Sequence, residues 1–198
     1  MRLESEIVHP GWLRVMHWLN AVAVLVLMFS GWRIYNATAF LGFSIPKEIT
    51  LGGWLGGALQ WHFAAMWLLA ANGVLYLAGN LATGRLWKKF FPLQLAVLLN
   101  DLSDAIKGRL THGDPSHYNM VQRLAYLFVM LDSVVLVLSG LVLWKSVQFP
   151  LLRVVMGGYE GARVVHFGAM SALVVFIVVH LVMVMLVPRT LRTMVRGR

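Results

Sequence analysis

The sequence contains no cysteine and little charge, since Asp, Glu, Lys and Arg together make up 13% of its 198 residues. Without cysteine the chain cannot form disulfides, thiolate-held iron–sulfur clusters, cysteine zinc sites or thioether links to a cofactor. Histidine is therefore the only strong metal ligand that remains. A soluble domain of this length rarely carries so little charge. With 59% hydrophobic residues and a mean hydropathy of +0.73, the composition predicts an integral membrane protein.

The few acidic residues leave a formal net charge of +9. Such an excess can indicate nucleic-acid binding, but here the basic residues flank apolar segments instead of sharing one amphipathic face. We expect contact with membrane lipid and none with nucleic acid. Four apolar runs are long enough to cross a bilayer as helices, at residues 12–35, 54–79, 122–144 and 164–187. The predicted fold class is an all-α integral membrane protein, a four-transmembrane-helix bundle forming a single domain over 1–198.

Lys and Arg are distributed unequally between the two sides of these spans. One side, made of residues 1–14, 85–123 and 189–198, holds twelve, and the other side holds five. Because positive charge is retained in the cytoplasm, both termini and the long middle loop are predicted to be cytoplasmic, in a bacterial inner membrane. Apolar residues at helical spacing over 95–106 predict an amphipathic surface helix between spans two and three. No internal repeat is visible.

Four histidines lie inside the predicted spans: His17, His62, His166 and His180. The fourth span contains no formally charged residue, and His166 and His180 are its only ionisable groups. Fourteen residues at about 100° each make about 1400°, roughly 40° short of four turns, and separate the two by about 21 Å. Both histidines therefore lie on nearly the same face of the helix, one near each leaflet of the bilayer.

Histidines can share a metal only at matching depth, which predicts two stacked bis-histidine sites. His17 pairs with His180 near the cytoplasmic side, and His62 pairs with His166 near the outer side. One intramembrane histidine can simply hydrogen-bond to a neighbouring helix. Four in two depth-matched pairs indicate ligands instead, because a buried polar group without a partner is costly. Zinc usually takes three or four protein ligands, whereas haem needs two axial imidazoles, so two haem b groups with an electron-transfer role are expected.

Small and basic residues near these sites fit the same interpretation. Glycines would let a flat macrocycle approach the helix backbone, although they are also common at ordinary helix contacts. Arginines near either membrane surface could pair with haem propionates, or could only set the topology or snorkel. The glycines are Gly31, Gly73, Gly140 and Gly168, and the arginines are Arg14, Arg33 and Arg163.

Several motifs resemble a known family. They are "RVMHWLN" at 14–20, "WHFAAMW" at 61–67, "HYNMVQRLAY" at 117–126 and the histidine pair spaced by fourteen. Together they are similar to the di-haem cytochrome b subunits that anchor nickel–iron hydrogenases, formate dehydrogenases and thiosulfate reductases, in the bacterial b561 superfamily. The resemblance spans nearly the whole chain, and it implies two b haems held by the same histidine pairs.

The resemblance also implies a quinone site. In the formate dehydrogenase type, an asparagine and a glutamine matching Asn119 and Gln122 lie beside the cytoplasmic haem and help bind quinone. The alternative is that they cap span three, where asparagine is a favoured N-cap. Asn72 lies about ten residues after His62, and its amide could contact the same quinone. Asp132 lies about 15 Å into span three, where a carboxylate is paired, protonated or part of a proton route.

The function expected from the sequence is that of an electron-transfer membrane subunit. It would pass electrons between a periplasmic catalytic or electron-transfer partner and the quinone pool, in either direction. The chain has no cysteine cluster or nucleotide motif, so chemistry on an external substrate belongs to another polypeptide. A free-standing superoxide-to-quinone oxidoreductase is the alternative, with Lys47, Arg153 and Arg163 attracting the anion. A haem-free membrane scaffold or transporter is a third possibility.

Overall fold

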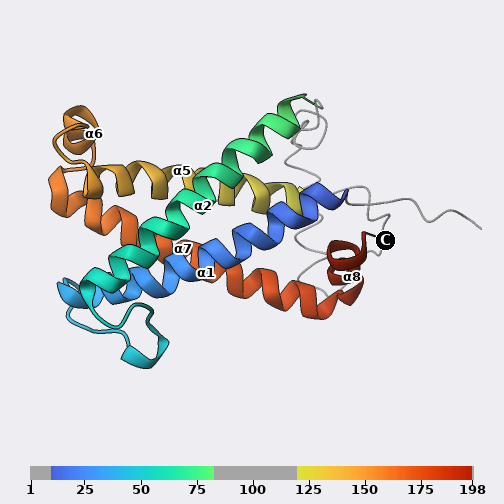
Figure 1. Ribbon diagram of the computed structural model, residues 1–198, viewed down its shortest axis with the longest axis horizontal. Helices are drawn as coiled ribbons and strands as arrows, with labels where there is room; N and C mark the ends of the chain where they lie inside the picture. The colour runs from blue at the N-terminus through green and yellow to red at the C-terminus, as the bar shows by residue number, and fades with distance from the viewer. Residues whose placement is uncertain (1–9, 83–119, 198) are drawn as a thin grey trace, which may run out of the picture. The chain divides into compact units, whose positions relative to one another are not determined.

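The described part of the computed structural model, residues 10–82 and 120–197, is helical, and it contains no strand (Figure 1). The predicted all-α class is confirmed. The predicted surface helix over 95–106 lies outside the described residues. The elements are α1 (Gly11–Ala37), η1 (Lys47–Ile49), α2 (Leu55–Ala82), α5 (Met120–Trp144), α6 (Pro150–Val155), α7 (Gly158–Leu186) and α8 (Pro188–Arg196).

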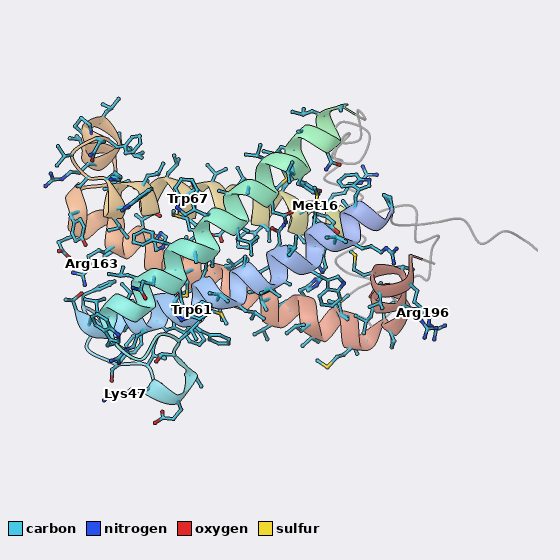
Figure 2. All side chains as sticks on the ribbon, viewed as in Figure 1. Met16, Lys47, Trp61, Trp67, Arg163 and Arg196 are labelled. Atoms are coloured by element: carbon cyan, nitrogen blue, oxygen red, sulfur yellow. The ribbon has the colours of Figure 1, made fainter. Side chains whose placement is uncertain are left out.

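Four of these helices, α1, α2, α5 and α7, are long and apolar enough to cross a membrane. The chain is therefore a multi-pass membrane protein, as predicted. Most large apolar side chains on these spans are exposed, and Trp61 and Trp67 on α2 are 52% and 61% exposed (Figure 2). Such side chains contact lipid in a bilayer, whose tails are as apolar as the side chains themselves.

The ends of the helices have local causes. Gly157, with φ of +76°, adopts the left-handed conformation immediately before α7, which favours glycine. At the other end of α7, Pro188 lacks the backbone N–H that would continue the helix, and it becomes the first residue of α8 instead. The start of α7 lies six residues before the predicted apolar run, because the helix continues through Glu160 and Arg163, which form an ion pair of 2.7 Å.

The chain divides into two compact units, and α1 and α2 with the end of α8 form the first. α1 and α2 pack antiparallel, since Ser30 late in α1 contacts His62 early in α2, while Met16 early in α1 contacts Asn72 further along α2. Small residues on both helices, including Ala23 on α1, are buried, and small residues let helix backbones approach closely.

The second unit contains α5, α6 and α7. α5 and α7 also pack antiparallel, because Ser139 late in α5 contacts His166 early in α7. Val142 and Ala162 are fully buried in this unit, and the rings of Phe128 and Phe176 lie 6.2 Å apart. That residues 1–198 form a single domain stays a prediction.

Candidate cofactor site

His62 is held by the neighbouring helix in the first unit. Its Nδ1 lies 3.0 Å from the Oγ of Ser30, and this Oγ also donates to the carbonyl of Val26 at 2.6 Å. Gly31 follows the serine, and a Cβ added there would lie 3.5 Å from the His62 Cε1, an ordinary van der Waals contact. The edge of the imidazole carrying Nδ1 and Cε1 therefore faces the backbone of α1.

His166 is held in the same way in the second unit. Its Nδ1 lies 2.9 Å from the Oγ of Ser139, which donates to the carbonyl of Val135 at 2.6 Å. A Cβ added at Gly140 would lie 3.4 Å from the His166 Cε1. Both units thus present a Ser-Gly pair on their first span to a histidine on their second.

His17 and His180 have aromatic neighbours. The ring of His17 on α1 makes an edge contact with Trp18 at 5.5 Å between centroids. The ring of His180 on α7 stacks on Phe176 at 5.9 Å. Because α7 runs without interruption from Gly158 to Leu186, His166 and His180 lie about 21 Å apart on nearly the same face, as their spacing predicts.

All four histidines lie at similar depth in their helices. His17, His62 and His166 follow the first residue of α1, α2 and α7 by six, seven and eight residues, and His180 precedes the last residue of α7 by six. At 1.5 Å per residue, each is about 9–12 Å from the nearer end of its helix. The depth of each histidine in the membrane stays a prediction.

The four histidines are divided equally between the two compact units. His17 and His62 belong to the first compact unit, and His166 and His180 to the second, so each pair takes one histidine from each unit. Among the described residues, no group of three or more His, Asp or Glu side chains is arranged to hold a metal ion. His17 with His180, and His62 with His166, stay predictions.

The observed donor set suits haem b. Two imidazoles, those of His62 and His166, have Nδ1 hydrogen-bonded inside their own helix pairs, which directs the opposite ring nitrogen, Nε2, away from Ser30 and Ser139. A haem iron takes axial imidazoles through one ring nitrogen while the other makes such a hydrogen bond. A Cβ added at Gly73 or Gly168 would meet no atom within 4 Å, so both positions leave room for a flat ring.

Asn72 has a structural role in the first unit. Its Nδ2 donates to the carbonyl of Met16 at 2.8 Å and to the Oδ1 of Asn20 at 2.6 Å, so both amide protons are used. The bond to Met16 ties α2 to the residue preceding His17. The suggested contact of the Asn72 amide with quinone stays a prediction, and any such contact would have to use its oxygen.

Asp132 is 8% exposed, and its Oδ2 has no hydrogen-bond partner among the described residues. Asn20 belongs to the other compact unit, where its Oδ1 accepts a hydrogen bond from Asn72. Two of the arginines make hydrogen bonds within their own compact units, since Arg14 donates to the carbonyl of Val195 at 2.7 Å and Arg163 donates to Glu160. These bonds do not test propionate binding.

The predicted quinone residues are not tested either. Asn119 lies outside the described residues, and Gln122 lies in the first turn of α5 with a side chain that is not described. Residues that sequence reasoning missed are Ser30 and Ser139. A signal existed in the "SG" dipeptides at 30–31 and 139–140, each in the span before a histidine-bearing helix.

These features define a class of protein: a membrane protein with four candidate spans, three of which carry the four histidines. The sequence profile of the prokaryotic cytochrome b561 family matches residues 8–197, and the chain belongs to this family. It is 66% identical to the putative protein-methionine-sulfoxide reductase subunit YedZ1 of Azospira oryzae over 197 residues, which cover both chains fully.

A second relative is more distant. The chain is 24% identical to the probable Ni/Fe-hydrogenase B-type cytochrome subunit of Cupriavidus necator over 196 residues, covering 90% of this chain and 78% of the relative. No solved structure matches the chain significantly. The chain is thus a b561-type membrane cytochrome subunit, and its family implies haem b as cofactor.

Proposed function

We propose that this protein carries electrons from the quinone pool to a periplasmic catalytic subunit that reduces methionine sulfoxide in proteins. Its place would be the bacterial inner membrane, with both termini in the cytoplasm. The observation that carries the electron-transfer role is the set of four histidines inside the spans, each six to eight residues from an end of its helix, two of them held through Nδ1 by buried serines. The choice of partner rests on the 66% identity to the YedZ1 subunit.

Four residues would bind two haem b groups. His17 and His180 would hold one near the cytoplasmic side, and His62 and His166 would hold the other near the outer side. Haem b supplies reversible one-electron transfer, and axial imidazoles on both faces favour this over oxygen binding. The apolar spans around the histidines exclude water, and Ser30 and Ser139 hold two of the imidazoles.

The quinone would react near the predicted cytoplasmic end of α5. Asn119 and Gln122 lie in sequence at that end, and an amide can donate to a quinone carbonyl or accept from a quinol hydroxyl. Oxidation of one quinol releases two electrons and two protons. Reduction of one sulfoxide consumes two electrons and two protons and gives a thioether and water, so the two half-reactions balance.

The catalytic chemistry would occur on the partner, because the chain contains no cysteine and no nucleotide motif. Electrons would then run outward, from quinol near the cytoplasmic haem to the partner near the outer haem. This direction follows from the oxidising nature of a sulfoxide, which accepts electrons. A hydrogenase partner, as in the Cupriavidus relative's name, would instead deliver electrons inward.

The test uses the complex purified from membranes in mild detergent. A pyridine haemochrome assay is expected to give two haem b per chain, and a quinol analogue should reduce both haems. Adding a peptide containing methionine sulfoxide should then reoxidise them only when the catalytic partner co-purifies. One haem or none per chain would contradict the di-haem assignment. Reduction by superoxide without a partner would favour the free-standing oxidoreductase.

A further inference from the structure

We propose that Ser30 and Ser139 are positioning residues that fix the tautomer and ring orientation of His62 and His166, so that each imidazole presents the lone pair of Nε2 to a haem iron. This inference rests on the proposed function, because it requires that both histidines bind haem. It concerns two serines of the spans that neither bind the haem nor contact a substrate.

The hydroxyl proton of Ser30 is already used within its own helix. A serine hydroxyl has a single proton, and Ser30 donates it to the Val26 carbonyl at 2.6 Å. Toward the His62 Nδ1, 3.0 Å away, the same Oγ can therefore act only as an acceptor. It follows that Nδ1 carries the proton, and a neutral imidazole protonated there has its lone pair on Nε2.

Ser139 repeats the arrangement with the same atoms. Its hydroxyl donates to the Val135 carbonyl at 2.6 Å, and its Oγ lies 2.9 Å from the His166 Nδ1. Both serines are completely buried, so no solvent competes for the Oγ. A metal-binding histidine commonly donates its other N–H to an acceptor of this kind, which fixes the tautomer and raises the basicity of the ligand.

A structural role for the serines is the competing explanation. Serines in membrane helices often donate to the carbonyl four residues earlier, and Ser171 on α7 does so to Phe167 at 2.8 Å. Among the described residues, Ser171 makes no hydrogen bond to a histidine. The contact with a histidine Nδ1, and not the bond to the helix carbonyl, distinguishes Ser30 and Ser139. Ser171 is therefore a matched control.

The test compares Ser30→Ala, Ser139→Ala and Ser171→Ala in the full-length, haem-loaded protein in detergent. Removing the serine oxygen takes away one acceptor beside Nδ1–H, which makes the imidazole a weaker donor and destabilises ferric iron. At His166 the ring also hydrogen-bonds to the Leu136 backbone, so the smaller change is expected in Ser139→Ala. We therefore expect each of the first two variants to raise the midpoint potential of the affected haem and to change its largest EPR g value. Transfer of that haem to apomyoglobin should become about ten-fold faster, and Ser171→Ala should match the wild type.

If Ser30→Ala or Ser139→Ala loses its haem altogether, the threonine variant at the same position, Ser30→Thr or Ser139→Thr, is measured as well. Threonine keeps the hydroxyl, so it should retain the haem. Failure of threonine to do so would overturn the proposal, as would wild-type potentials and g values in both alanine variants. His62→Ala and His166→Ala test the underlying assignment separately. If both retain all haem, the proposed ligands are wrong. If they lose haem while the serine variants behave as wild type, only the positioning role fails.

Discussion

At the scale of single residues, two buried polar side chains of the spans differ in their partners. The Asn72 amide makes two hydrogen bonds to α1, whereas the Asp132 Oδ2 has no partner among the described residues. We expect Asn72→Val to lower the free energy of unfolding by roughly 0.5–2 kcal/mol, the range for hydrogen bonds between membrane helices. Asp132→Val should raise it by about 1 kcal/mol, because an unsatisfied buried acceptor is removed.

Unfolding of the purified variants in increasing sodium dodecyl sulfate, followed by the haem absorbance, would measure both changes. The two substitutions serve as controls for each other, since each replaces a buried polar residue by valine. A stability loss in Asp132→Val would contradict the expectation. If that variant also slowed haem reduction by quinol, the carboxyl would have a role in the electron or proton path.

The sequence singles out the four histidines, whose role as ligands stays a prediction, and it does not single out the two serines, for a physical reason. An ionisable side chain inside an apolar run is costly, so it is conspicuous in a sequence. A serine donates to its own helix at little cost, and Ser30 and Ser139 resemble Ser171 until the neighbouring helix is in place. Which serine contacts a histidine depends on the register between two neighbouring helices. Hydropathy does not predict this register.

At the scale of elements, α7 carries one predicted ligand of each haem on an unbroken helix. Inserting one alanine after Val174 would rotate His180 by about 100° relative to His166. We expect the variant to lose one haem, measured by the haemochrome assay. Replacing Val174 by alanine, with no insertion, should leave both haems in place. Retention of two haems by the insertion variant would contradict ligation by both histidines of α7.

Hydropathy located the spans but not all helix ends or the short helices. The predicted run of 164–187 is the apolar part of α7, and the helix begins at Gly158 because glutamate and arginine at helical spacing continue it. α6 has six residues and α8 has a strongly charged sequence, so neither resembles a span. Both begin with a proline, Pro150 and Pro188, a residue that favours the first position of a helix.

At the scale of the whole molecule, the all-helical class, the four spans and the cytochrome family were predictable, because each depends on composition and on histidine spacing. The pairing of histidines depends on how the two compact units assemble. Alanine variants test it: His62→Ala and His166→Ala should remove the same haem, and His17→Ala and His180→Ala the other. Potentiometric titration distinguishes the two haems, and loss in the crossed pattern would contradict the pairing.

The quinone site is a second prediction for the molecule as a whole. Gln122→Ala should slow reduction of the haems by quinol about ten-fold or more, while the haem spectra and reoxidation through the partner stay unchanged. Gln148→Ala, beyond the opposite end of α5, is the matched control. Stopped-flow absorbance measures both rates. An unchanged rate in Gln122→Ala would mean that this glutamine has no part in binding quinone.

The turn before α2 has a consequence for how the sequence can vary among related proteins. Gly52 has a φ of +106°, and a Cβ added there would overlap the backbone of Ala58. Gly53 has a φ of +68°, and a Cβ added there would meet no atom within 4 Å. Natural variation should therefore retain glycine at 52 and admit asparagine or aspartate at 53, which tolerate the left-handed region. Because this turn sets where α2 begins, a lineage that lost Gly52 would also have to re-establish the depth of His62.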